Sequence, residues 1–331
     1  MKKRLIDLRD EKPILDVASY GRGTFRSFTP AERAQIARTV ARAPEVMVKV
    51  SGGARTLGGV AAHLAYIDRD NFEIETDMGE RIHEKASQKA LLEDWDLDLE
   101  THWHQSERAI NEPRRPPKLV HNIIFSMPPG TNPGKVLEAV RRLAVNEWAL
   151  KHRYAMVLHT NEAHPHVHVL VKARSEQGHR LNIRKATLRN WRTQFAENLR
   201  DLGVAANATE RAVRGRPNIN LPDRLYRPIK RRESTYLRQR ALTLYDELNH
   251  TATPMPDNGR AKMLATRQAV DRGWRSVSQL LANEGYHELA HQAQRFVDQM
   301  RPPPAEWQII AFHLQPPKQQ LIRTPRLERT R

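Results

Sequence analysis

The sequence contains no cysteine. Disulfide bonds and thiolate metal ligands are therefore excluded, so a metal ion would have to be held by histidine or carboxylate side chains. No apolar run approaches the roughly 20 residues that a membrane-spanning helix needs. The N-terminal stretch MKKRLIDLRDEKPILD is charged throughout and lacks the apolar core of a secretory signal. We therefore expect a cytoplasmic protein without membrane insertion.

Acidic residues are few relative to basic ones. The 55 Lys and Arg exceed the 38 Asp and Glu, which gives a net charge of +17 and a pI near 10.4. Such a balance favours a polyanionic partner, either nucleic acid or an anionic membrane surface. The charge is also segregated, because residues 172–240 hold 18 basic and 6 acidic side chains while residues 73–112 hold 12 acidic and 4 basic.

Histidines are concentrated in the stretch YAMVLHTNEAHPHVHVLVK, residues 154–172, where the basic segment begins. Two short strands are predicted, at 154–159 and 164–172, and a turn folds His159 back against the second strand. Alternate side chains of a strand share a face, and here that face carries His164, His166 and His168. Neutral imidazoles that converge from two neighbouring strands make a metal site with open coordination positions, as catalysis requires. We expect a basic face beside this cluster.

The remaining pattern predicts an α+β fold with an antiparallel or mixed central sheet, flanking helices and a helical C-terminal region. Further strands are predicted at 45–51, 72–75, 119–126 and 178–183. Helices are predicted at 30–42, 57–69, 86–95, 133–148, 187–202, 234–249, 261–272 and 276–300. Trp191 is open to two interpretations, a core side chain or a platform for stacking bases.

Tyr66 lies near the end of the helix predicted at 57–69, beside the buried positions Val60, Leu64 and Ile67. Taken by itself it is an ordinary half-buried tyrosine. The preceding glycines, Gly52 and Gly53, match neither a Walker loop nor a dinucleotide fingerprint.

Three stretches in order resemble the relaxases of conjugative and mobilisable plasmids, in particular the P-type mobilisation family that includes the T-DNA border endonuclease, within the HUH endonuclease superfamily. HLAYIDRDN at 63–71 is similar to the motif that carries the nucleophilic tyrosine. HNIIFSMPPG at 121–130 is similar to the segment whose serine lies against bound DNA. HTNEAHPHVHVLVK at 159–172 is similar to the metal-binding histidine motif.

The resemblance implies roles for individual residues. Tyr66 would be the nucleophile, assisted by His159, and Ser126 would contact the DNA strand. His159, His166 and His168 would bind metal, while His164 would bind metal or phosphate. Asn161 and Lys172 depart from the family's Asp and Asn, so Glu162 or Asp68 would supply the carboxylate that orients a ligand. Further DNA contacts are expected from Arg69, Lys172, Arg184, Lys185, Arg211 and Arg214.

The implied activity is site- and strand-specific nicking and rejoining of DNA at a plasmid origin of transfer through a covalent 5′-phosphotyrosine. The expected cofactor is Mg²⁺ or Mn²⁺, although imidazoles also suit Zn²⁺ or Ni²⁺. Expected partners are single-stranded and supercoiled origin DNA, relaxosome accessory proteins, a coupling ATPase and a type IV secretion system. The protein would act in the bacterial cytoplasm or be exported to the recipient with the bound strand.

The expected domains are an N-terminal extension at 1–44, a relaxase nuclease domain at 45–218, a helical domain at 219–311 and a disordered basic tail at 312–331. Two other functions are compatible with parts of the sequence. A histidine-triad nucleotide hydrolase would use the alternating histidines, with a middle His attacking phosphorus. A non-catalytic DNA-binding component of the transfer machinery would use only the basic surface.

Overall fold

The computed structural model of the chain describes residues 27–67, 73–82, 85–97, 117–216, 235–250, 258–304 and 308–310. The described chain forms two compact units, one holding Phe28–Thr209 and the other the residues from Glu210 onward. The domain boundaries expected from the sequence stay predictions, and the tail expected at 312–331 lies outside the described residues.

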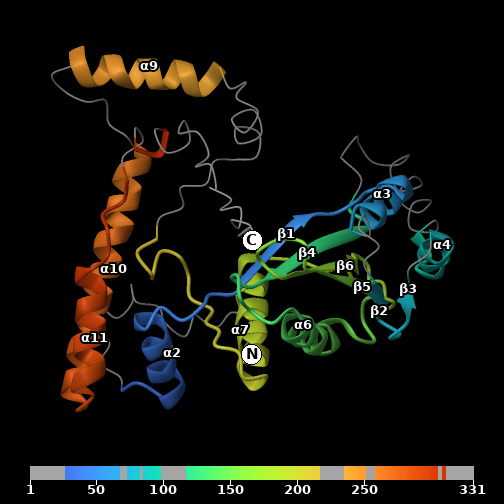
Figure 1. The fold of residues 1–331 in the computed structure, drawn as a ribbon, viewed down its shortest axis with the longest axis horizontal. Coiled ribbons are helices and arrows are strands. Elements are labelled where there is room, and N and C mark those ends of the chain that lie inside the picture. Colours follow the sequence, from blue (N-terminus) through green and yellow to red (C-terminus); the bar gives the residue numbers. More distant parts are fainter. Residues whose placement is uncertain are drawn as a thin grey trace, which may run out of the picture. The chain divides into compact units, whose positions relative to one another are not determined.

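A six-stranded antiparallel sheet forms the centre of the first unit (Figure 1). The strand order is β1-β4-β6-β5-β2-β3, and every neighbouring pair is antiparallel. The strands are β1 Met47–Gly52, β2 Ile74–Thr76, β3 Arg81–Ile82, β4 Val120–Ser126, β5 Tyr154–His159 and β6 His166–Lys172. This sheet and its flanking helices confirm the predicted α+β class.

One face of the sheet packs against two long helices, α6 Pro133–Trp148 and α7 Lys185–Asp201 (Figure 1). The core between them includes Phe125, Trp148, Trp191 and Phe195, whose rings meet edge to face at centroid distances of 5.3 to 6.4 Å. Trp191 has no exposed surface and donates from Nε1 to Glu147 at 2.9 Å. The core interpretation of this tryptophan is therefore confirmed.

The opposite face is covered over part of its width by α3 Leu57–Ile67 and α4 Lys85–Asp94. The spacing of Val60, Leu64 and Ile67 places all three on one side of α3, where they are fully buried. They pack in a second core with side chains of β2, β5 and β6. The same face carries His159, His166 and His168, and His159 contacts the end of α3.

Helix α2, Pro30–Val40, also belongs to the first unit. Thr29 and Glu32 form the capping box that starts the helix, with Pro30 in its first turn. At its other end, Thr39 accepts a hydrogen bond from the buried Asn207 amide at 3.1 Å. The helix is thereby fixed to the segment that follows α7.

The second unit is helical, which confirms the predicted character of the C-terminal region. Its helices are α9 Thr235–His250, α10 Asn258–Asn283 and α11 His287–Asp298. Trp274 of α10 packs edge to face on Phe296 of α11 at 5.1 Å between ring centroids. None of the described helices combines the length and the hydrophobicity needed to cross a bilayer.

Three local predictions are wrong. The helix expected at 276–300 is interrupted, because Gly285 adopts φ +85° between α10, which ends at Asn283, and α11, which begins at His287. The strand expected at 178–183 is absent, because Gly178 forms a turn at φ +85° and leaves only an isolated bridge between Arg174 and Arg180. The break expected between residues 272 and 276 is also absent, since α10 continues through Gly273. Burial of Trp274 and its neighbours against α11 outweighs the roughly 1 kcal/mol cost of a helical glycine.

Candidate metal centre and tyrosine

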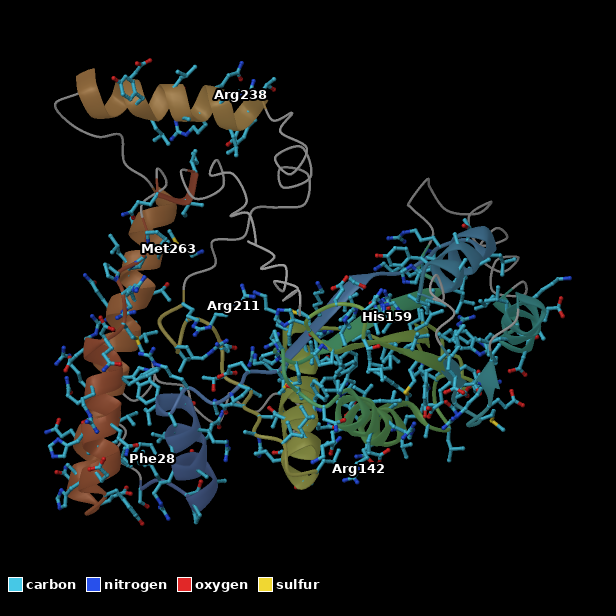
Figure 2. The ribbon with its side chains drawn as sticks, in the orientation of Figure 1. Phe28, Arg142, His159, Arg211, Arg238 and Met263 are labelled. Atoms are coloured by element: carbon cyan, nitrogen blue, oxygen red, sulfur yellow. The ribbon has the colours of Figure 1, made fainter. Side chains whose placement is uncertain are left out.

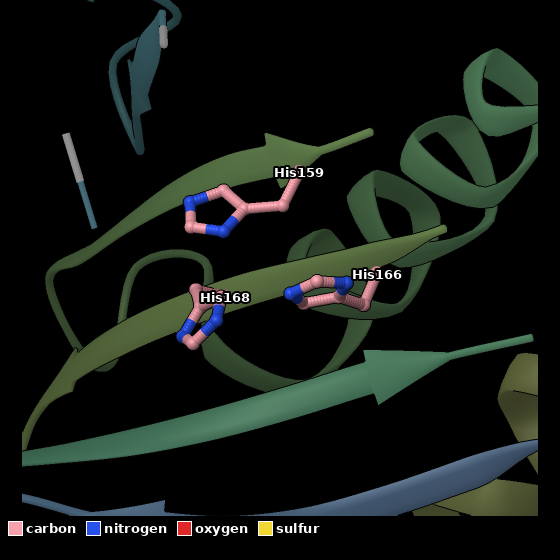
Figure 3. Close-up of side chains that lie close together, drawn as sticks. All are labelled: His159, His166 and His168. Atoms are coloured by element: carbon pink, nitrogen blue, oxygen red, sulfur yellow. The ribbon is translucent and has the colours of Figure 1, made fainter. Parts of the chain in front are cut away.

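Three histidines meet on the central strands of the sheet. His159 on β5 is paired directly with His166 on β6, and His168 lies two residues further along β6 on the same face. One ligand nitrogen from each lies within 4.8 Å of the others, and the three side chains are 1%, 8% and 6% exposed. Figure 3 shows the three rings facing a common space, and Figure 2 places His159 at the sheet of the first unit.

The hydrogen bonds around these rings determine which nitrogens have lone pairs for a metal. His159 Nε2 lies 2.7 Å from the Ile67 carbonyl, and His166 Nδ1 lies 2.9 Å from the His164 carbonyl. A carbonyl can only accept, so both of these nitrogens carry hydrogen. The lone pairs of the neutral rings are then on Nδ1 of His159 and Nε2 of His166. Carbonyl acceptors of this kind commonly orient metal-binding histidines.

His168 has a different second contact. Its Nδ1 lies 3.2 Å from the side-chain nitrogen of Asn122 on β4, so a metal would bind Nε2, and only when the ring hydrogen is on Nδ1. Burial and the neighbouring His159 and His166 lower the pKa of His168 to about 3. The ring is therefore neutral at physiological pH, as ligation requires.

The donor set suits a catalytic rather than a closed structural metal site. Three neutral imidazoles occupy one side of an ion and leave the remaining positions for water or substrate oxygens. Imidazole is an effective ligand for Zn²⁺ and Ni²⁺, whereas Mg²⁺ and Mn²⁺ prefer oxygen ligands, and the geometry does not select one of these ions. His159, His166 and His168 thus fit a divalent ion with open coordination positions.

Tyr66 lies on the helix that is bonded to this cluster. The Ile67 carbonyl that accepts from His159 belongs to the next residue along α3. The Tyr66 side chain is 52% exposed, although its neighbours Leu64 and Ile67 are buried. Its ring stacks on His63 one helical turn earlier, with the centroids 6.3 Å apart and the planes 19° from parallel. The Tyr66 phenol is therefore accessible to solvent near a helix end that is hydrogen-bonded to one histidine of the cluster.

Ser126 lies in the same cross-strand row as two of the histidines. This row runs from Met47 on β1 through Ser126 on β4 and His166 on β6 to His159 on β5. Ser126 is 5% exposed, and its hydroxyl lies 3.5 Å from the Met127 carbonyl. The structure thus brings together Ser126 and the three predicted ligands.

The next row holds Lys49, Ile124 and His168, and Lys49 was not predicted from the sequence. Its side chain is exposed, and its ammonium is among the groups that lower the pKa of His168. Met47 is 37% exposed, and Ile124 is partly exposed. Within the described part of the chain, the β1–β4 side of this face thus offers a cation and apolar surface beside the histidines.

The other predicted site residues lie elsewhere. His164 is exposed in the turn before β6, where its Nδ1 lies 3.3 Å from the Met127 carbonyl, and it is not part of the three-histidine group. Lys172 ends β6, is 6% exposed and donates to Glu176 at 3.3 Å. Arg184 and Lys185 are exposed at the start of α7.

Three predicted DNA contacts are not placed at the cluster. Arg69 lies outside the described residues, as does Asp68, one of the two carboxylates expected to orient a ligand. Glu162, the other, is exposed in the turn before β6. Arg211 and Arg214 belong to the second unit. Their roles stay predictions.

Sequence reasoning missed Asn122 as well as Lys49. The available signal was the alternation of side chains in the predicted strands, which assigns Lys49 and Asn122 each to one face of its strand. The register that aligns β1 and β4 with β6 was needed to place them on the histidine face.

The central strands of the antiparallel sheet carry three histidines that could hold a metal ion, and comparison with known proteins shows which proteins combine these features. Residues 73–204 match the model described as relaxase, MobA/VirD2-like, nuclease domain. This segment contains β2 to β6, α6, α7 and all three histidines. This part of the chain is therefore similar to the nuclease domain of the MobA/VirD2-like relaxases. The matched segment begins after Tyr66.

Two curated relatives are T-DNA border endonucleases named VirD2. The protein from Agrobacterium fabrum (strain C58 / ATCC 33970) is 26% identical over 211 residues, which cover 59% of this chain and 46% of the relative. The protein from Rhizobium radiobacter is 26% identical over 187 residues, which cover 52% of this chain and 43% of the relative. The chain thus spans less than half the length of these relatives.

Proposed function

We propose that the chain nicks and rejoins one DNA strand at an origin of transfer, with Tyr66 as the nucleophile and a covalent 5′-phosphotyrosine as the intermediate. The relaxase match implies DNA as the substrate. The observation that carries the assignment is the hydrogen bond from His159 to Ile67, which holds the helix of Tyr66 at a cluster able to bind metal.

In the proposed reaction, the Tyr66 oxygen bonds to the scissile phosphorus while the bond to the 3′ oxygen breaks. The phenol proton is lost and the departing oxygen is protonated, so a free 3′ hydroxyl results. A phenol attacks poorly at neutral pH, since its ordinary pKa is near 10, and needs a base or positive charge nearby. The bound ion would supply that positive charge. His159 is the proposed assistant because its Nε2 hydrogen bond to Ile67 holds the residue next to Tyr66 while its Nδ1 is left for the ion.

A divalent ion bound by the three histidines would polarise the scissile phosphate and offset charge on its oxygens. Ser126 would contact the strand from the row that holds His166 and His159. The phosphotyrosine keeps the energy of the phosphodiester, so the reverse attack by a 3′ hydroxyl rejoins the strand without ATP. Nicking and rejoining therefore need one nucleophile and one site.

Phosphate contacts away from the nick are proposed at the start of α7. Arg184 and Lys185 are exposed there, although cations are disfavoured at the positive end of a helix dipole. A DNA phosphate would be attracted by both the cations and the dipole, which would relieve that cost. Lys172, Arg211, Arg214 and Arg69 remain proposed contacts on the basis of charge.

The proposed setting is plasmid mobilisation. The chain would act on supercoiled or single-stranded origin DNA with relaxosome accessory proteins, a coupling ATPase and a type IV secretion system. The expected ion is Mg²⁺ or Mn²⁺.

The test is detection of a covalent adduct. The full chain is incubated with Mn²⁺ and a labelled pool of random single-stranded oligonucleotides, and adducts that survive SDS are isolated, sequenced and mapped by peptide mass. We expect enrichment of one DNA sequence at the cleaved end and attachment at Tyr66. Tyr66→Phe should abolish the adduct, whereas Tyr236→Phe, which alters an equally exposed tyrosine, should not.

Two experimental results would each support one of the alternative functions instead. Absence of an adduct with every divalent ion would favour the non-catalytic DNA-binding role. Nucleotide hydrolysis that survives in Tyr66→Phe and is lost in His166→Ala would favour the histidine-triad hydrolase.

A further inference from the structure

Asn122 lies between the candidate metal centre and the ring beside Tyr66. Its side chain is 1% exposed on β4. Its amide nitrogen lies 2.7 Å from Ser51 Oγ and 3.2 Å from His168 Nδ1. The same amide contacts His63, whose pKa is lowered by burial and raised by this contact. His63 in turn stacks on Tyr66.

Two atoms in this group lack a suitable partner among the described residues. They are the Asn122 Oδ1 and the His63 Nε2, and both are buried. A buried polar atom without a partner destabilises the fold, so an arrangement that pairs both atoms would be favoured. The donors and acceptors of Asn122, Ser51, His168 and His63 allow such an arrangement.

The requirement of metal binding selects that arrangement. With its nitrogen towards His168, Asn122 donates to Nδ1, and the hydrogen of the neutral ring is then on Nε2, the nitrogen that should bind metal. For Nε2 to bind, Nδ1 must carry the hydrogen and meet an acceptor. Rotation of the amide by half a turn supplies its oxygen to His168 and to the Ser51 hydroxyl.

The same rotation turns the amide nitrogen towards His63. His63 Nε2 must then accept, so the hydrogen of the neutral His63 ring is on Nδ1. His159 and His166 differ from His168 in this respect, because backbone carbonyls already fix their hydrogens in the form that ligation needs. His168 instead faces the side-chain amide of Asn122, which can present either its oxygen or its nitrogen to the ring.

We propose that Asn122 is a positioning residue that presents His168 Nε2 to the metal and, through His63, makes the tautomer of the ring beside Tyr66 depend on metal binding. This inference rests on the proposed metal-dependent function and adds how the ion and the nucleophile are coupled. Neither Asn122 nor His63 contacts the reacting atoms in this account.

The first test measures metal affinity of the full chain by titration calorimetry with Mn²⁺. Asn122→Ala removes the acceptor and should weaken binding about 10-fold to 100-fold. Asn122→Asp keeps an acceptor in either orientation and should restore affinity to within a few-fold of wild type. Ser51→Ala leaves the Asn122 oxygen in place and should change affinity little. Circular dichroism of each variant checks that it folds.

The second test needs no variant and therefore holds even if Asn122→Ala does not fold. The full chain with ¹⁵N-labelled histidine is titrated with Zn²⁺, a diamagnetic ion, and the ring nitrogens are followed by NMR. We expect His168 to gain an Nδ1 hydrogen and a bound Nε2, and His63 to move to the Nδ1–H form.

Distinct outcomes separate this inference from the proposed function. Wild-type affinity in a folded Asn122→Ala, or an Asn122→Asp as weak as Asn122→Ala, would overturn the role of Asn122. His63 signals that ignore saturating Zn²⁺ would overturn the coupling. If the wild type binds neither ion, the metal-dependent function itself fails.

Discussion

The surroundings of two histidines of the first unit, His121 and His168, lower their pKa. His121 on β4 is the clearest case outside the metal centre, because burial and the nearby Lys118, Arg180, His152 and Arg55 lower its pKa to about 4. Its Nδ1 is buried without a hydrogen-bond partner among the described residues. Protonation of this ring therefore opposes folding.

The sign of the resulting pH dependence follows from the two pKa values. Between pH 6.5 and about 4 the unfolded chain binds a proton at His121 that the folded chain does not. Stability is therefore greatest above pH 6.5 and falls as the pH drops through this window. In His121→Gln we expect the slope of unfolding free energy against pH to be smaller by up to about 1.4 kcal/mol per pH unit. Urea denaturation from pH 4 to 8 measures it, and an unchanged slope would contradict the prediction.

Lys49 is the exposed cation closest in register to His168, since both pair with Ile124. A positive charge beside the metal would stabilise the charge that develops on phosphate oxygens. We predict that Lys49→Ala lowers the single-turnover rate of strand cleavage roughly 10-fold to 100-fold without weakening Mn²⁺ binding. Lys135→Ala, an exposed lysine on α6 across the sheet, is the matched control. Equal losses in the two variants would point to a general charge effect instead.

At the scale of an element, the loop before α3 fixes where the tyrosine helix begins. Gly53 has φ +140°, and a Cβ there would lie 2.3 Å from the Val120 carbonyl of β4. The absence of a side chain at Gly53 thus allows the loop to touch the strand. Gly58, inside α3, has open space around its Cα.

These two glycines make a matched pair for a stability prediction. Gly53→Ala should lower the unfolding free energy by more than about 2 kcal/mol, because both the backbone conformation and the close contact resist a side chain. Gly58→Ala should raise it by about 0.5 kcal/mol, since alanine favours the helix. Urea denaturation with unfolding monitored by far-ultraviolet circular dichroism decides, and a similar change in both variants would show that the contact with β4 is unimportant.

The elements also show which features the sequence could predict. Period-two alternation at 166–172 and helical spacing in α3 identified the histidine face and the buried side of the tyrosine helix. Asn122 and Lys49 could not be assigned, because their position beside His168 depends on pairing between strands far apart in the sequence. The continuity of α10 was missed because Gly273 weakens the local signal while packing on α11 compensates.

At the scale of the whole molecule, the metal ligands all lie within one of the two compact units. A ligand that binds only the folded form stabilises it by about 2.7 kcal/mol at a hundred times its Kd. We predict that a fragment of residues 27–209 folds alone and shows the same rise in Tm with Mn²⁺ as the first unit of the full chain. Scanning calorimetry of both proteins measures this. A fragment that folds but does not respond to Mn²⁺ would show that residues beyond 209 contribute to the site.

The direct pairing of His159 with His166 also has a consequence for folding. If β6 slipped by one residue against β5, Val167 would face Val157 and the imidazoles would point into the hydrophobic layer under α6. Such a misaligned hairpin could not bind an ion. Metal affinity therefore reports strand alignment in this protein, and selection for the chemistry would at the same time remove sequences that fold out of step.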